Sequence, residues 1–121
     1  MTNEQQRKML ECAAKACGMW ESRLPVASKA DGAFYEYVKR TYWENGRERR
    51  EYWGPLTNPL DTAEMCAELG IDWINSVDSV ISVSAEYDCE AFLKDHDNSR
   101  LKAWMYAATM CAAKIGGYTD A

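Results

Sequence analysis

The sequence has one histidine, three prolines and two phenylalanines among its 121 residues, and it has no long run of apolar side chains. A membrane-spanning helix needs about 18 or more consecutive apolar residues, so no membrane contact is expected. The N-terminal segment carries acids and amides without an apolar core, which argues against a secretion signal. A zinc site needs four clustered cysteine or histidine ligands. Since the five cysteines contain no Cys-x-x-Cys pair, we predict no metal and no cofactor.

Motifs for catalysis are scarce as well. A nucleophilic serine or cysteine needs a base and an orienting group, and His96 is a possible partner for Cys89. His96 lies in the charged stretch LKDHDN, where we expect a solvated side chain. Paired acids such as Asp95 and Asp97 can hold a hard cation, but solubility explains them in the acidic segment 86–98. No glycine-rich loop fits a phosphate-binding pattern, so we expect no enzymatic activity.

Charge is unevenly distributed along the chain. Residues 1–53 hold ten Lys and Arg against eight Asp and Glu, a net charge of +2, whereas residues 54–121 hold four against eleven, a net charge of −7. The total of −5 makes duplex DNA an unlikely partner, because DNA binding depends on neutralising phosphates. An odd number of cysteines on predicted apolar faces indicates reduced, buried thiols and favours a cytoplasmic protein.

Three helices are predicted from apolar periodicity and from capping residues. They span residues 4–17, 59–69 and 99–115. Thr2 and Gln5 form a capping box for the first helix, and Asn58 with Pro59 begins the second. The predicted apolar stripes are Met9, Leu10, Ala13, Ala14 and Cys17; Leu60, Ala63, Cys66 and Ala67; and Leu101, Trp104, Met105, Ala108, Cys111, Ala112 and Ile115.

Residues 34–53 allow two interpretations. One is a helix that begins near Asp31, and the other is a β-hairpin that turns at Asn45-Gly46, a strong hairpin signal. Aromatic and β-branched residues favour strands. The hairpin register pairs Glu44 with Arg47, Arg40 with Glu51 and Val38 with Trp53. Two of these pairs are opposite charges and one is apolar, as in a stable ribbon, so we favour the hairpin.

The other strands are expected within residues 71–85, as two strands that meet at a turn. Residues 19–33 lack a clean period and are interpreted as a loop, in which Trp20 anchors to the core. The segment 86–98 is interpreted as irregular. These elements predict a single α+β domain over residues 1–121, with a small antiparallel sheet of three to four strands and flanking amphipathic helices in helix–sheet–helix layers.

Three stretches carry a family pattern: MLECAAKACG at residues 9–18, WGPLTNPLDTAEMCAELGID at 53–72 and AATMCAAKIG at 107–116. They resemble the phage ABA sandwich domain family, small proteins of unknown function encoded by tailed phages and prophages. The residues that match its anchoring pattern are Trp53, Pro55, Leu56, Thr57 and Asp61. Gly54 stands where the family usually has Asn, Asn58-Pro59 replaces an acidic pair, and residues 19–45 do not align. The resemblance implies the fold and the cytoplasm of an infected bacterium, and it implies no particular activity.

The stretch YWENGRERREYWGPLTNP, residues 42–59, gathers arginines and aromatic rings around one turn. Arginine holds carboxylate or phosphate in a fork and aromatic rings stack on planar groups, and the same composition is typical of protein interfaces. The predicted binding residues are Arg40, Tyr42, Trp43, Arg47, Arg49, Arg50, Tyr52 and Trp53. The loop with Pro55, Thr57 and Asn58 is a secondary candidate. The alternative is a solvated ribbon whose arginines pair with neighbouring glutamates.

These observations predict a non-enzymatic phage accessory protein that binds a host or anti-phage-defence protein. The alternative is a small-molecule sponge that sequesters a nucleotide signal at an aromatic and arginine site. Five tryptophans and seven tyrosines exceed what one thin layer needs, so we expect a homodimer. Its interface would be either the ribbon around Asn45-Gly46 or the last helix, through Trp104 and Ala108.

Overall fold

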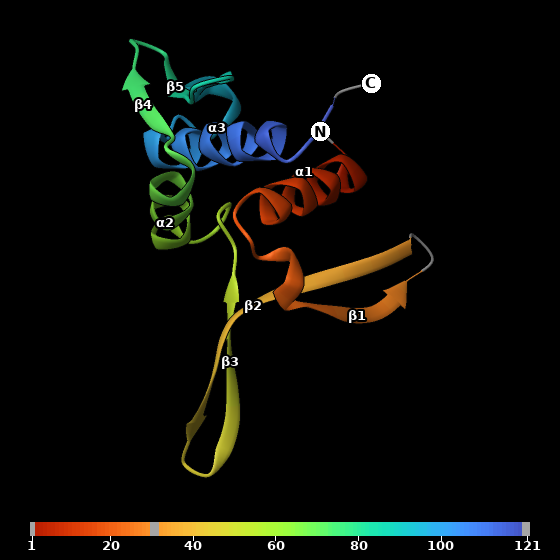
Figure 1. Ribbon diagram of the computed structural model, residues 1–121. Coiled ribbons are helices and arrows are strands. Elements are labelled where there is room, and N and C mark those ends of the chain that lie inside the picture. Colours follow the sequence, from red (N-terminus) through yellow and green to blue (C-terminus); the bar gives the residue numbers. More distant parts are fainter. Residues whose placement is uncertain (1, 30–31, 120–121) are drawn as a thin grey trace.

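The α-helices follow the predicted capping signals closely. A computed structural model describes residues 2–29 and 32–119, and within them the chain forms three α-helices and two three-stranded antiparallel sheets (Figure 1). The helices are α1 (Asn3–Ala16), α2 (Pro59–Leu69) and α3 (Arg100–Ile115). The capping box is present, since the Gln5 backbone N–H donates to Thr2 Oγ1 over 3.1 Å and the Thr2 N–H donates to Gln5 Oε1 over 2.8 Å. The three helices and two separate antiparallel sheets confirm the α+β class.

The buried face of α2 differs from the predicted stripe. Leu60 is mostly exposed, and Ala63 and Ala67 are exposed as well. The buried residues of the helix are instead Asp61, Thr62, Met65 and Cys66. Asp61 and Thr62 are polar, and each is buried because it hydrogen-bonds to the connection before the helix. Apolar periodicity cannot detect a helix face whose contacts are polar.

One of the two sheets lies against α3. Its strands are β4 (Asp72–Asn75), β5 (Ser79–Val83) and β6 (Asp88–Phe92), in the order β4-β5-β6. The two strands expected within residues 71–85 are confirmed. The interpretation of 86–98 as irregular is wrong for β6, where Cys89 and Ala91 are buried and alternate with exposed residues. These inward side chains are small, so the alternation is weak in the sequence. A short 3₁₀ turn, η2 (Leu93–Asp95), follows.

The other sheet comes from the N-terminal half of the chain. A 3₁₀ turn, η1 (Trp20–Ser22), leads into β1 (Arg23–Lys29), β2 (Gly32–Glu44) and β3 (Arg47–Trp53), in the order β1-β2-β3. The loop predicted for 19–33 is wrong for residues 23–29 and 32–33, because β1 pairs with the first half of β2. Residues 30–31 of that prediction lie outside the described residues. β1 contains Pro25, which an edge strand accommodates because only one side of it is hydrogen-bonded. Trp20 packs on the core as predicted.

The hairpin interpretation of residues 34–53 is confirmed. Asn45 and Gly46 both have positive φ, 51° and 75°, as the two central residues of a type I′ turn require. The pairs Glu44 with Arg47 and Arg40 with Glu51 form as predicted. The pair of Val38 with Trp53 is wrong, because the register shifts between Val38 and Arg40. This bulge places Val38 opposite Tyr52 and turns Tyr37 toward Trp53.

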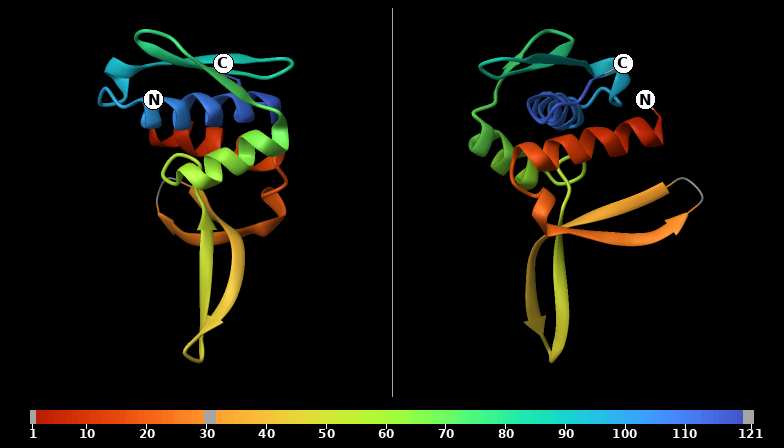
Figure 2. Two further views of the ribbon diagram at one scale, coloured as in Figure 1. Left: turned by 90° about the vertical axis from the view of Figure 1, so that its left-hand side faces the viewer. Right: turned by 45° about the vertical axis from the view of Figure 1, so that its right-hand side comes forward.

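The helices and the β4–β6 sheet form the body of the molecule. α3 packs on β5 and β6 on one side and on α1 and α2 on the other (Figures 1 and 2). Alanines allow this close packing, since Ala107, Ala108 and Ala112 of α3 are fully buried. The β1–β2 and β2–β3 hairpins leave the body as two diverging arms (Figure 2).

Candidate binding surface

The end of the β2–β3 hairpin, residues 40–52, is referred to below as the ribbon. It projects away from the helices (Figures 1 and 2), and every residue from 40 to 50 is exposed. Trp43 is 74% exposed and Tyr52 is 46% exposed. Large aromatic side chains left in water on such an arm contribute nothing to the core of the chain. They are the type of residue that dominates the energetics of protein interfaces.

Side chains of the ribbon alternate between its two faces. Cross-strand partners share a face, so Trp43 lies beside Glu48, and Thr41 lies beside Arg50. On the opposite face the Tyr42 ring lies beside Arg49, and the Arg40 guanidinium carbon lies 4.9 Å from the Tyr42 ring centroid. Both faces therefore present cations and aromatic rings together.

The arginines of the ribbon differ in how far they are already paired. Arg40 bonds to Glu51, and Arg50 lies 3.9 Å from Glu48. Arg47 and Arg49 make no ion pair with the residues described by the structure. Exposed ion pairs contribute little and exchange easily. All four guanidinium groups therefore remain available to an incoming carboxylate or phosphate, Arg47 and Arg49 most directly.

Trp53, one of the predicted binding residues, is buried, unlike the exposed residues of the ribbon. It is 8% exposed, and its ring meets Tyr37 edge-on with a centroid distance of 5.7 Å. Tyr37 in turn contacts Trp20. The shift in register turns these rings toward the body, so they fasten the arm instead of contacting a partner.

A partly buried ion pair holds the base of the ribbon to α2, and the sequence did not indicate it. Lys39 Nζ donates to Asp61 Oδ1 over 2.7 Å and to Glu64 Oε1 over 3.0 Å. The second Asp61 oxygen accepts from the Gly54 N–H over 2.9 Å. The hydrogen bond to Asp61, followed by that to Glu64, raises the pKa of Lys39. This contact fixes where the ribbon leaves the body. The one available signal was Asp61 at the start of a helix, which capping already explained.

A polar hollow separates the ribbon from the start of β1. Its volume is about 390 Å³, and three arginines line it: Arg23, Arg40 and Arg50. Glu21 and Glu48 lie on the same walls. Arg23 is held in place, since its guanidinium lies 4.2 Å from the Trp20 ring centroid and donates to the Trp20 carbonyl over 2.9 Å. The charged side chains of the lining are therefore three arginines and two glutamates.

In the secondary candidate loop, polar groups of Pro55, Thr57 and Asn58 already form hydrogen bonds within the chain. Asn58 Oδ1 accepts from the Leu60 N–H over 3.0 Å, and Thr57 Oγ1 donates to the Gly54 carbonyl over 3.3 Å. Pro55 is buried, and its carbonyl accepts from Thr62 Oγ1 over 2.7 Å. These contacts give the loop a structural role in starting α2.

His96 is half-buried, so the expectation of a solvated side chain is wrong. Its ring lies against Tyr106, with a centroid distance of 4.7 Å, because η2 folds back over α3. Cys89 faces Cys111 in the core instead, where the hydrogen bond to Cys111 and burial both raise the pKa of Cys89. A nucleophile–base pair of Cys89 with His96 does not form.

The described part of the chain contains neither a metal-binding cluster nor a membrane-spanning helix. Among residues 2–29 and 32–119, no group of three His, Cys, Asp or Glu side chains is placed to hold a metal ion, and all five cysteines there are free thiols. None of the helices in the described ranges has the length and apolar character needed to cross a bilayer. Comparison of the chain with protein-family models, curated proteins and solved structures gives no match.

Proposed function

We propose that this chain is a non-enzymatic binding protein whose ribbon recognises an acidic patch on another protein. The observation that supports the proposal is the exposure of all residues from 40 to 50 on an arm that carries Trp43, Arg47 and Arg49. The resemblance to phage ABA sandwich proteins supplies the setting of the proposal. The chain would act in the cytoplasm of an infected bacterium, on a host or anti-phage-defence protein.

The chemistry of the ribbon favours a carboxylate-rich partner surface with an apolar centre. Trp43 offers a flat apolar area that becomes buried on contact, and the surrounding guanidinium groups form forked bonds to carboxylates. Since residues 54–121 carry a net charge of −7, an acidic partner is attracted to the ribbon and repelled by the C-terminal part of the chain. Charge thus increases the rate at which the partner meets the ribbon and fixes the orientation in which it binds.

The test is affinity capture with the full chain and a matched pair of double variants. Trp43→Ala with Arg49→Ala removes one ring and one free cation from the ribbon. Val77→Ala with Lys94→Ala removes an exposed apolar side chain and an exposed cation from the other end of the molecule. A stoichiometric partner that the wild-type chain and the Val77/Lys94 variant retain, and that the Trp43/Arg49 variant loses, supports the proposal. Equal retention by both variants contradicts it.

A second candidate function rests on the polar hollow. Three arginines around about 390 Å³ match the phosphates of a small nucleotide, and the sponge hypothesis therefore remains the alternative. Tight binding raises the melting temperature by mass action. A thermal-shift panel of cyclic and linear nucleotides, repeated with Arg23→Ala, tests it. A panel in which no nucleotide raises the melting temperature of the wild-type chain contradicts the sponge.

Self-association through the ribbon is also part of the proposal. The predicted alternative through Trp104 and Ala108 of α3 is less favourable, because Ala108 is fully buried inside the chain and Trp104 packs on Trp73. β3 is an open edge strand. An antiparallel copy centred on Arg49 would place Arg47 opposite Glu51 and Glu48 opposite Arg50 of the second chain. Opposite charges at these positions stabilise such a pairing.

A further inference from the structure

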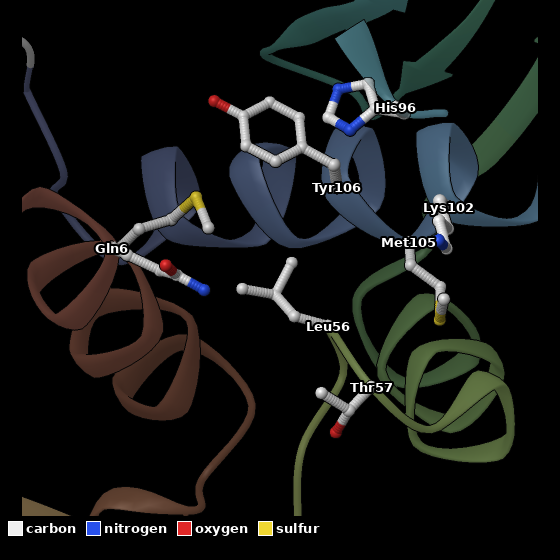
Figure 3. Close-up of a pocket in the computed structure, with 8 residues that line it drawn as sticks. Gln6, Leu56, Thr57, His96, Lys102, Met105 and Tyr106 are labelled. Carbon is white, nitrogen blue, oxygen red and sulfur yellow. The ribbon is translucent and has the colours of Figure 1, made fainter. Parts of the chain in front are cut away.

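A second hollow lies in the body of the molecule, away from the tip of the ribbon. It opens between α1, α3 and the connection before α2, and its volume is about 450 Å³. Figure 3 shows Gln6 reaching toward it from α1, Leu56 projecting into it from the connection, and Met105 and Lys102 bordering it from α3. Its size falls in the range of small-molecule sites, about 300–1,000 Å³.

The floor of this cavity is apolar and adaptable. Met9 and Met105 line it, and both side chains are otherwise buried, with exposed fractions of 0% and 6%. Leu56 adds a branched aliphatic side chain. Thioethers are polarisable, fill irregular gaps and make favourable contacts with aromatic rings. A flat ring therefore suits this floor better than a strongly hydrated molecule.

One wall of the cavity is aromatic. The rings of His96 and Tyr106 both line it and lie 4.7 Å apart with an interplanar angle of 39°. Their mutual contact orders them before any ligand arrives, which reduces the entropy lost on binding. An aromatic ligand can extend this pair by offset stacking or edge contact.

The mouth of the cavity is cationic although the chain is acidic. Lys102 is the charged side chain of the lining, and no carboxylate of the described residues lines the cavity. Lys102 Nζ donates to Asp97 over 2.7 Å, but both side chains are more than half exposed, so this pair is weak. An ammonium group has three donors. One of them reaches Asp97, and the others are available to an anion at the mouth.

We propose that this cavity binds a small aromatic molecule that carries one negative charge. The ring would lie on Met9, Met105 and Leu56 beside the His96–Tyr106 pair, and the anionic group would meet Lys102 at the mouth. The Gln6 amide, which borders the same opening, supplies a further donor and acceptor. This site is separate from the ribbon, so the proposal does not depend on the protein partner proposed above.

Isothermal titration calorimetry of the full chain tests the proposal with 2-naphthoate as the probe. Its neutral analogue, 2-naphthalenemethanol, keeps the ring and lacks the charge. We expect saturable binding of 2-naphthoate with one site per chain and a dissociation constant between about 1 μM and 1 mM. The neutral analogue should bind about tenfold more weakly or worse. Absence of 2-naphthoate binding at millimolar concentration would overturn the proposal.

Three variants at exposed positions locate the site without disturbing the core. Lys102→Ala should weaken 2-naphthoate binding about tenfold and leave the neutral analogue unaffected, since only the charge contact is lost. Lys8→Ala, an exposed lysine of α1 outside the lining, is the matched control. Gln6→Trp should fill the opening and abolish binding of both probes. If Lys102→Ala and Gln6→Trp both bind 2-naphthoate as the wild-type chain does, the probe binds elsewhere and the assignment is wrong.

Discussion

At the scale of single residues, Asp61 connects three parts of the chain. It is fully buried, accepts from Lys39 of β2 and from the Gly54 N–H, and itself belongs to α2. Removing one partner of a buried pair leaves an uncompensated group. We therefore expect Asp61→Ala to lower the free energy of unfolding by about 2–4 kcal/mol in urea titrations.

Two further variants separate the contributions of Asp61. Asp61→Asn keeps an acceptor for the Gly54 N–H and should recover part of the loss. Glu64→Ala removes the other hydrogen-bonded carboxylate of Lys39, which is 52% exposed, and should cost less than about 1 kcal/mol. An equal loss for Glu64→Ala and Asp61→Ala would contradict the role given to the buried carboxylate.

Tyr37 gives the residue-scale prediction for pH. Burial, together with the nearby Glu11 carboxylate, raises the pKa of Tyr37 to about 12. Between about pH 10 and pH 12, the native chain therefore keeps the phenol proton of Tyr37. The unfolded chain, with an ordinary tyrosine pKa of about 10, has lost it in the same range. This contribution to stability is fully present below about pH 10 and is lost as the pH rises toward 12.

The measurement is the free energy of unfolding of the wild-type chain and of Tyr37→Phe at several pH values from 9 to about 12. Stability of the wild-type chain should fall across this window, and part of that fall should disappear in Tyr37→Phe. Lys39 accounts for some of the remaining decrease, because its pKa is also raised in the native chain. Identical pH dependence in both proteins would show that Tyr37 ionises as freely in the fold as outside it.

At the scale of elements, α1 and the end of α3 cross at very close range. A Cβ atom added at Gly116 would overlap the backbone carbonyl of Cys12, and a backbone atom cannot move aside as a side chain can. We expect Gly116→Ala to lower the free energy of unfolding by about 1–3 kcal/mol or more through overpacking, measured by urea unfolding.

The neighbouring glycine provides the control for this crossing. Gly117 has a φ of +97° and no atom within 4 Å of an added Cβ, so Gly117→Ala should cost only the strain of that conformation, about 1–2 kcal/mol. The crossing also predicts that Gly116→Ala separates α1 from α3 and broadens amide signals in both helices. A Gly116→Ala chain as stable as the wild type would contradict the close contact.

At the scale of the whole molecule, the ribbon is expected to make the chain a dimer. Light scattering coupled to size exclusion should give twice the mass of one chain for the wild type. Trp43→Glu should stay folded, because its carboxylate lies on the exposed surface of the single chain. It should be a monomer, because the carboxylate replaces an aromatic ring of the ribbon that forms the dimer interface. Trp104→Glu should instead destabilise the fold, since Trp104 packs on Trp73 within the chain and a poorly paired buried carboxylate is costly.

A charge swap tests the predicted strand pairing within that dimer. Arg47→Glu alone would place the new carboxylate opposite Glu51 of the second chain. The repulsion between these two carboxylates should favour the monomer. Adding Glu51→Arg restores opposite charges between the chains and should recover the dimer. A single-chain mass for the wild type at every concentration would contradict self-association, and a dimer unaffected by Arg47→Glu would contradict this register.

The sequence by itself determined the elements whose signals are local. Helix starts at Thr2 and Asn58 and the turn at Asn45-Gly46 depend on hydrogen bonds and backbone angles within a few residues. The pairs between that turn and the bulge, which include Glu44 with Arg47 and Arg40 with Glu51, could be predicted because a two-residue turn fixes the register up to the bulge. The aromatic and arginine content of the ribbon was likewise visible without a structure.

Only the tertiary structure decided which of these side chains are available. The bulge after Val38 moves Tyr37 and Trp53 into the core, and the buried carboxylate of Asp61 selects the inner face of α2. The cavity beside His96 exists because α1, the connection before α2 and α3, which are far apart in the sequence, meet there. Contacts of this kind depend on how segments that are distant in the sequence pack against one another. Neither apolar periodicity nor turn chemistry predicts which distant residue a given side chain will contact.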